Sequence, residues 1–259
     1  MMKYEVGPVK ATQNGAVDTL LWGQGDIPTG PEVKGVTIVQ TGTAHDLDSI
    51  ANFVMAVGNT EFVNFANDAQ IVALYDSLGK KALATSAVRW TVMLQNTYGH
   101  PIQDPGCAAP AVGGDLSMTI VTDGTGSAVG TVTPIFHLDP EFPATSYPHW
   151  VSQQLASGTP SNATLKIDDE GALLCGFVYD STNVTTLGFR YGGKDIIPNL
   201  TPTQILELQE LWQGTTVTSP RAVWFPTPLP VLKGLTSFKI TGSGAVGQIL
   251  PLLKKPYAA

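Results

Sequence analysis

The sequence contains one unit twice, and this internal duplication limits the folds that the chain can adopt. From residue 184 to 214 it predicts a strand, a tight turn at Gly192-Gly193, a short strand and a helix. The same order recurs 134 residues earlier, from residue 50 to 79. In this register the paired residues are Gly42 and Gly176, Gly58 and Gly192, Gln70 and Gln204, and Trp90 and Trp224. A constant offset over this length favours duplication over chance similarity.

A later match has a smaller offset, which indicates an insertion in the first half. With an offset of 117 residues, Pro134 falls on Pro251, and the Ala-Val-Gly triplet at 128–130 falls on that at 245–247. The first half therefore carries 17 extra residues. We assign them to residues 96–114, a Gly-, Pro- and Ala-rich stretch that is typical of a surface loop.

Each repeat unit is expected to hold one short helix. In the second half Thr201 is a suitable N-cap and Pro202 suits the first helical position, where no amide donor is missed. Four apolar residues then recur at helical spacing: Ile205, Leu208, Leu211 and Trp212. In the first half the corresponding helix is expected at about residues 68–78, with Asn67 as its cap.

The remainder of the chain predicts short strands joined by turns, including a hairpin turn at Asn14-Gly15. Charged residues make up 14%, and glycine and proline are abundant, at 27 and 19 of 259 residues. Together with the repeat, this predicts an all-β protein of two tandem jelly-roll β-sandwich domains, each with one short helix. We expect the domains to be residues 1–138 and 139–259.

Charge and terminal composition narrow the function classes. A formal net charge of −7 argues against direct sequence-specific nucleic acid binding, which needs a basic surface. The chain shows no secretory signal and no apolar run long enough to span a membrane. Its two cysteines, Cys107 and Cys175, form no disulfide framework and suggest assembly in a reducing compartment.

No residue pattern predicts catalysis or metal binding. The four histidines are not at metal-ligand spacing: His45, His100, His137 and His149. The acidic cluster at residues 168–170 is interpreted as a solvated turn. No nucleophile elbow, phosphate loop, dinucleotide fingerprint or paired-cysteine motif occurs. We therefore nominate no catalytic, cofactor-binding or metal-binding residues, although a carboxylate pair assembled in space for glycoside hydrolysis stays open.

The two repeat units resemble a known family. The segments AVGNTEFVNFANDAQIVALYDSL in the first half and GFRYGGKDIIPNLTPTQILELQELW in the second carry the strand, glycine turn and helix in order. This pattern is similar to the double-jelly-roll major capsid proteins of tailless icosahedral viruses, the lineage of tectiviruses, corticoviruses and adenoviruses. The chain length suggests a compact version, like those of membrane-containing bacteriophages.

The resemblance implies a structural, non-enzymatic subunit of a virion shell, assembled in the host cytoplasm without a cofactor. It implies a homotrimer whose six lobes tile an icosahedral shell, with the insertion at 96–114 as a loop or turret. Neighbouring capsomers, vertex or penton proteins and minor capsid proteins would be its partners. Contact with an internal viral membrane stays open, because the sequence lacks an obvious amphipathic N-terminal helix.

Two other functions remain as alternatives. One is a two-domain carbohydrate-binding or glycan-cleaving protein built of paired jelly rolls. The missing signal and the scattered aromatic residues count against it. The other is a minor capsid or spike protein. The mass in solution separates the main alternatives, since a shell subunit is expected to be a stable trimer and a lectin or hydrolase a monomer.

Overall fold

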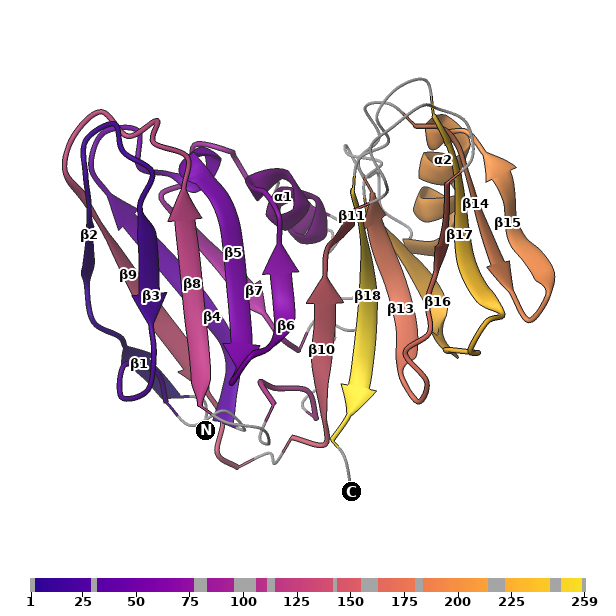
Figure 1. Ribbon diagram of the computed structural model, residues 1–259, viewed down its shortest axis with the longest axis horizontal. Helices are drawn as coiled ribbons and strands as arrows, with labels where there is room; N and C mark the ends of the chain where they lie inside the picture. The colour runs from indigo at the N-terminus through magenta and orange to yellow at the C-terminus, as the bar shows by residue number, and fades with distance from the viewer. Residues whose placement is uncertain are drawn as a thin grey trace.

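The computed structural model shows two β-sandwiches side by side, each with one α-helix among its described residues (Figure 1). It describes residues 3–28, 32–76, 83–95, 106–110, 115–141, 144–154, 163–179, 184–213, 222–242 and 248–257. We call the sandwich built from β1 to β9 the first barrel and that built from β10 to β18 the second barrel. No described helix is both long and apolar enough to cross a membrane.

Two sheets form the first barrel. The strands are β1 (Lys3–Val6), β2 (Lys10–Thr12), β3 (Thr19–Trp22), β4 (Val33–Thr41), β5 (Ile50–Val57), β6 (Thr60–Phe65), β7 (Arg89–Met93), β8 (Leu116–Thr122) and β9 (Gly130–Leu138), with helix α1 (Asp68–Asp76) after β6. One sheet runs β1-β9-β4-β7, and β2 also pairs with β9. The other runs β6-β5-β8-β3.

The second barrel repeats these pairings. Its strands are β10 (Ser146–Val151), β11 (Gln153–Gln154), β12 (Ala163–Lys166), β13 (Leu173–Tyr179), β14 (Val184–Tyr191), β15 (Lys194–Leu200), β16 (Ala222–Pro230), β17 (Thr236–Gly242) and β18 (Gln248–Pro256), with helix α2 (Pro202–Gln213) after β15. Here β10 and β11 pair with β18, which leads to β13 and β16, and the second sheet runs β12-β17-β14-β15. Apart from the pairing of β10 with β6, each described strand thus has a counterpart with the equivalent partners, which confirms the predicted duplication.

The hairpin and helix of the repeat unit correspond residue by residue. Gly58 and Gly192 both have a φ of 57° in their turns, and each hairpin has a register shift three residues before its turn glycine. Gln70 and Gln204 each accept a hydrogen bond from a backbone amide just before their helix. Their own amides bond to the side chains of Asn67 and Thr201, as in a capping box.

The equivalence of the two tryptophans is wrong by one residue. Trp90 lies on β7 and Trp224 on β16, which are corresponding strands. Trp90 points into the first barrel, where its ring lies edge-on to Phe53 and its Nε1 donates to Gln40. Trp224 points out of the second barrel, because its neighbours Val223 and Phe225 occupy that core. A slip of one residue exchanges the faces of a strand.

Three further expectations need correction. Gly42 follows the end of β4, whereas Gly176 lies inside β13 opposite Trp224, so this pair is not equivalent. The turn at Asn14-Gly15 forms, but β2 and β3 belong to different sheets and make no hairpin. On α2, Leu211 is 77% exposed and lies outside the apolar face that buries Ile205. The second member of the Ala-Val-Gly match, 245–247, lies outside the described residues.

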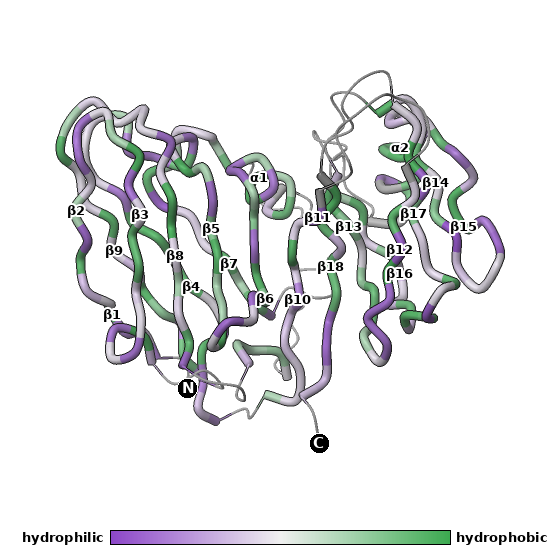
Figure 2. The backbone as a smooth tube through the Cα atoms, in the orientation of Figure 1, coloured by the Kyte–Doolittle hydropathy of each residue, from purple (hydrophilic) through white to green (hydrophobic). Residues whose placement is uncertain are grey.

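The molecule has two hydrophobic cores that share one sheet. Hydrophobic and hydrophilic residues alternate along many strands (Figure 2), and in the second barrel Leu174, Phe177 and Leu253 point into its own core. Residues of the opposite parity on the same strands join the core of the first barrel: Cys175, Val178, Ala222, Trp224, Leu250 and Leu252. The sheet β16-β13-β18 is therefore buried on both faces, an unusual position for an antiparallel sheet.

Candidate assembly interface

Strand β10 joins the two barrels. It pairs antiparallel with β18 of its own barrel and parallel with β6 of the first barrel, where Trp150 lies opposite Val63. One sheet of each barrel thereby becomes part of a single nine-stranded sheet. The Trp150 ring is fully buried, with its centroid 6.4 Å from that of Phe65. We call this contact, residues 150–152 with 62–65, the β10–β6 junction.

Polar groups fix the register of the β10–β6 junction. The backbone amide of Ser152 donates to the carbonyl of Asn64 at 3.1 Å. The Ser152 hydroxyl accepts a 3.0 Å hydrogen bond from Nε2 of Gln70, the residue that also caps α1. By contrast, Nε1 of Trp150 has no hydrogen-bond partner among the described residues. The indole is therefore held by packing, and its position is set by neighbours that do pair.

Part of the inserted segment supports the junction from one end. Cys107, Ala108 and Ala109 are fully buried. Their backbone bonds to Ser146 at the start of β10 and to Val33 at the start of β4, and Tyr257 donates its hydroxyl to the carbonyl of Ala109. The expectation of a surface loop is wrong for these residues, because their backbone donors and acceptors are used to join the barrels. The rest of 96–114, apart from Gly106 and Pro110, lies outside the described residues.

Three ionisable residues, Asp169, Lys255 and His149, border the junction. Asp169 accepts a 2.7 Å hydrogen bond from Lys255 and lies 3.9 Å from Nε2 of His149 on β10. Burial, and then the positive charge of Lys255, lower the pKa of His149 to about 4, although Asp169 acts in the opposite direction. His149 is thus neutral at pH 7. The acidic cluster at 168–170 is a turn as expected, but Asp169 is paired across strands.

The corresponding sheet of the first barrel has a different outer face. Threonines gather there: the Thr37 hydroxyl lies 2.8 Å from that of Thr91 and 2.7 Å from Nε2 of His137. Burial lowers the pKa of His137, and the Tyr4 ring lies edge-on to its imidazole at 5.0 Å. No described strand covers this face. It is half-exposed and more polar than the buried face of the second barrel.

His45 forms a structural contact that is confined to the first barrel. Its buried ring bonds through Nε2 to the carbonyl of Ala128 and lies 3.3 Å from the Thr12 hydroxyl. A Cβ atom added to Gly126 or Gly130 would overlap the ring. His45 therefore packs against a loop. The described residues contain no group of three or more histidine, cysteine and carboxylate side chains that could hold a metal ion.

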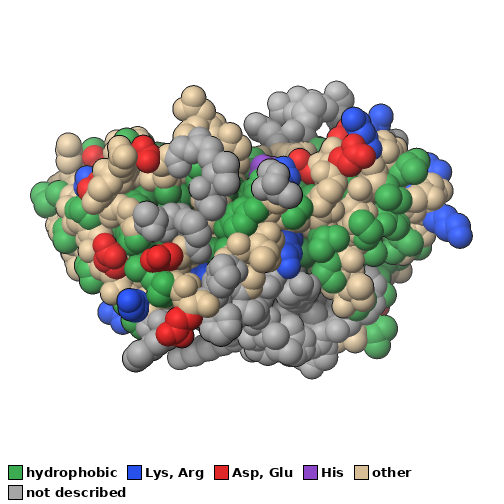
Figure 3. Space-filling view, turned by 90° about the horizontal axis from the view of Figure 1, so that it is seen from below, with side chains coloured by type: hydrophobic (Ala, Val, Ile, Leu, Met, Phe, Trp, Pro, Cys, Tyr) green, Lys and Arg blue, Asp and Glu red, His purple; other side chains and the backbone are tan. Residues whose placement is uncertain are grey.

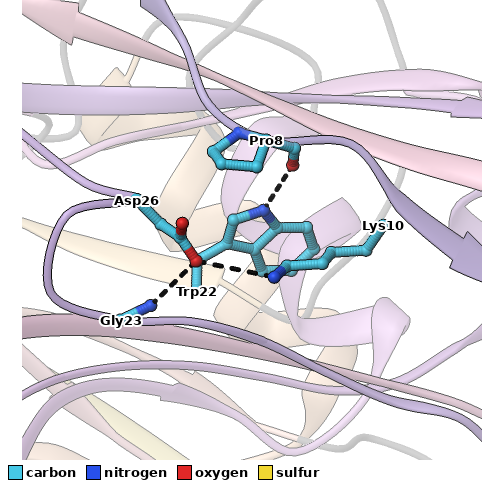
Figure 4. Close-up of polar contacts among 5 residues, drawn as sticks. All are labelled: Pro8, Lys10, Trp22, Gly23 and Asp26. Atoms are coloured by element: carbon cyan, nitrogen blue, oxygen red, sulfur yellow. Dashed lines mark hydrogen bonds and ion pairs between the residues drawn. The ribbon is translucent and has the colours of Figure 1, made fainter.

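A tryptophan fixes the segment between the edge strand β1 and β2 (Figure 4). The buried Trp22 of β3 donates from Nε1 to the carbonyl of Pro8, between β1 and β2, at 2.7 Å. The carboxylate of Asp26 lies 3.5 Å from Nζ of Lys10 and accepts from the amide of Gly23. This contact holds the segment that follows β1, so the outer edge of β1 keeps a defined position although its own residues are exposed.

Apolar side chains are exposed at both ends of the long axis. Tyr4, Val6 and Val9 lie at the β1 end, and Ile196 and Leu235 lie at the β15 end. In Figure 1 β2 and β15 are at opposite ends of the molecule. Seen from below, apolar side chains lie at the surface of both barrels between scattered charges (Figure 3). These two ends are the candidate assembly surfaces.

Sequence reasoning nominated no site residue, and it did not find the junction. Of the four histidines, His45, His137 and His149 lie in three separate places, and His100 lies outside the described residues. Trp150 carried no signal, because its partners on β6 come from the other half of the chain. The one-residue displacement between Trp90 and Trp224 was the available signal. It places Trp224 on the outer face of the second barrel, where the first barrel has no apolar counterpart.

Comparisons with known proteins give matches at the level of structure. No family model matches the chain, and no curated protein does. Among solved structures, the major capsid protein P2 from bacteriophage PM2 has a TM-score of 0.75 at 10% identity, over 100% of this chain and 98% of that one. The STIV MCP has a TM-score of 0.68 at 11% identity, over 99% of this chain and 97% of that one. The PBCV-1 virus capsid has a TM-score of 0.56 at 9% identity, over 98% of this chain and 93% of that one. The fold is therefore a double jelly roll, as predicted.

Proposed function

We propose that this double jelly roll is the major structural protein of an icosahedral virion shell. The observation that carries the proposal is the match with capsid proteins over the full length of both chains, including the arrangement of the two barrels. A shared single domain would support much less, because jelly rolls serve many functions. The proposed location is the virion, and the role is structural, without catalysis or a cofactor.

The proposed assembly unit is a homotrimer. Two similar barrels in each of three copies give a disc of six lobes, which suits hexagonal positions of a shell. Low charge, at 14%, also favours association, because a monomer would leave much weakly polar surface in water. We expect each trimer to bury well over about 2,000 Å², the range of obligate interfaces. The division into residues 1–138 and 139–259 belongs to the same proposal.

The further partners follow from the shell. Neighbouring capsomers would contact the flanks of the trimer, and vertex or penton and minor capsid proteins would complete the lattice. A bacterial host, assembly in its cytoplasm and an underlying viral membrane are parts of the same proposal. Sequence-specific nucleic acid binding is not, because the net charge of −7 disfavours contact with phosphates.

A dilution series tests the trimer. Native mass spectrometry of the purified chain should give three times the chain mass of 27.3 kDa, and sedimentation should keep that species at low micromolar concentration. A monomer at high micromolar concentration would contradict the shell subunit and favour the carbohydrate-binding alternative. A glycan-array measurement and an assay of glycan cleavage on the same sample should both be negative.

A further inference from the structure

The two barrels offer a template for contacts between copies. Inside the chain, one edge of the second barrel (β10) meets one edge of the first (β6). The counterpart of β10 is β1, and the counterpart of β6 is β15. Among the described strands these two counterparts pair only within their own barrels, with β9 and β14 respectively. The chain therefore contains one formed junction, between β10 and β6. It also contains the two strand edges of a second junction, β1 and β15, which do not pair with each other.

The equivalent residues can be assigned from strand register. With Pro134 matched to Pro251, Phe136 matches Leu253, which are the partners of Glu5 and His149. Val6 then takes the place of Trp150. On the other side, Val63 pairs with Met55 as Ile197 pairs with Phe189, so Ile196 takes the place of Phe62. These assignments rest on backbone pairing and need no contact between copies.

Burial differs sharply between the equivalent positions. Trp150 and Phe62 are fully buried at the junction. Val6 is 65% exposed and Ile196 is 48% exposed. All four residues are apolar. The free ends therefore carry apolar side chains like those of the junction, although no described residue buries them. Exposed apolar residues at matched positions of two complementary ends mark a contact surface.

Prolines distinguish the free ends from the junction. The amide of Ser152 donates to Asn64 in the junction, but Pro8 holds the place of Ser152 and has no amide hydrogen. Pro198 holds the place of Asn64, and it removes a donor from the outer edge of β15 because the amide and carbonyl of one residue point to the same side. Proline on an edge strand prevents ladder extension. The free ends can meet through side chains but cannot extend the sheet.

We propose that the β1 end of one copy packs against the β15 end of the next, with Val6 and Ile196 at the centre and without strand pairing. This inference rests on the proposed trimer, in which three such contacts close a ring. A head-to-tail contact forms a closed ring or an open filament, depending on the rotation between copies. The prolines disfavour only fibres that grow by continuous sheet addition.

Charge substitutions test the contact. Val6→Glu and Ile196→Glu each bury a carboxylate if the ends meet, and each should convert the trimer to a 27.3 kDa monomer in native mass spectrometry. Combining Val6→Lys with Ile196→Glu should restore the trimer. The matched control is Val88→Glu, since Val88 is 53% exposed just before β7, at the opposite edge of the sheet from β1; this variant should stay trimeric.

Cross-linking fixes which ends meet. The native cysteines are buried, so a short bismaleimide should link Val6→Cys protein to Ile196→Cys protein only when the two are mixed. Circular dichroism confirms that each variant is folded. A trimer that survives both glutamate substitutions and gives no mixed cross-link overturns this contact and leaves the shell proposal standing. A wild-type protein that is monomeric overturns the shell proposal itself.

Discussion

The same sheet has opposite surroundings in the two barrels. In the first barrel the outer face of β7-β4-β9 carries Thr91 and His137 and is half-exposed. In the second barrel the outer face of β16-β13-β18 carries Trp224 and Leu252 and is buried under the first barrel. Fold and pairing are the same, so the difference in composition follows from what lies against each face. A duplicated fold thus keeps its interior and adapts its exterior to its neighbours.

The largest effect on stability is expected at the β10–β6 junction, where the second barrel supplies β10. Trp150→Ala should lower the free energy of unfolding by about 3–5 kcal/mol, because it empties a fully buried site between the barrels. Trp150→Phe should cost much less, since it keeps most of the packing and removes a donor that has no described partner. Urea denaturation monitored by circular dichroism measures both.

The control for this comparison lies in the first barrel. Val6→Ala changes the matched position, which is exposed, and in the monomer it should alter stability by less than about 0.5 kcal/mol. If the alanine substitutions at Val6 and Trp150 lowered the free energy of unfolding equally in a monomeric sample, the two positions would be equally buried, which would contradict the structure.

Acid should weaken the second barrel through His149. Its pKa is lowered to about 4 in the folded protein, mainly by burial, against an ordinary value of 6.5. The unfolded chain therefore binds the proton first as pH falls from 6.5. Stability should be full above pH 6.5, decline by up to about 3 kcal/mol toward pH 4 and change no further through this residue below that.

The variant that isolates this effect is His149→Gln. Its unfolding free energy should decline less between pH 6.5 and 4 than that of the unsubstituted protein. His137→Gln serves as the counterpart in the first barrel, where burial also lowers the histidine pKa. An unchanged pH profile in His149→Gln would show that the imidazole has the same pKa in the folded and unfolded protein, which contradicts this prediction. A steeper decline in the variant would show that the imidazole is protonated in the folded protein and paired with Asp169.

The smallest effect is the difference in stability cost between substituting the two capping glutamines, Gln70 and Gln204. Gln204→Ala removes only a helix cap and should cost about 0.5–1 kcal/mol. Gln70→Ala removes the same cap and also the hydrogen bond to Ser152 across the junction, so it should cost about 1–2 kcal/mol. Thermal denaturation of the two variants side by side gives the difference. Equal costs would mean that the bond across the barrels adds nothing.

Much of the fold could be predicted, because local signals and the repeat agree. The turn at Gly192 and the caps at Asn67 and Thr201 depend on residues close in the chain, and they formed where expected. The register from Gly42 could not be predicted. The connection from β4 to β5 contains a 3₁₀ turn, Leu47–Ser49, and β13 has a register shift after Leu174. Such irregularities leave no periodic trace.

The junction was beyond sequence reasoning for a different reason. A tryptophan that points into its own barrel and one that points toward a neighbour are both apolar residues in a strand, as Trp90 and Trp224 are. Periodicity gives which residues share a face, but it does not say what covers that face. The burial of residues 107–109 was missed similarly, because Gly- and Pro-rich composition is typical of surface loops.

The shared sheet has a consequence for synthesis on the ribosome. When the first barrel has emerged, its β6 edge still lacks β10, and Phe65 still lacks the Trp150 ring that packs beside it. The N-terminal part of the nascent chain must therefore wait with an open strand edge until later residues arrive. Edges of this kind recruit other chains. On crowded polysomes, a chaperone that covers β6 until residue 151 has been synthesised and has emerged would prevent such contacts between nascent chains.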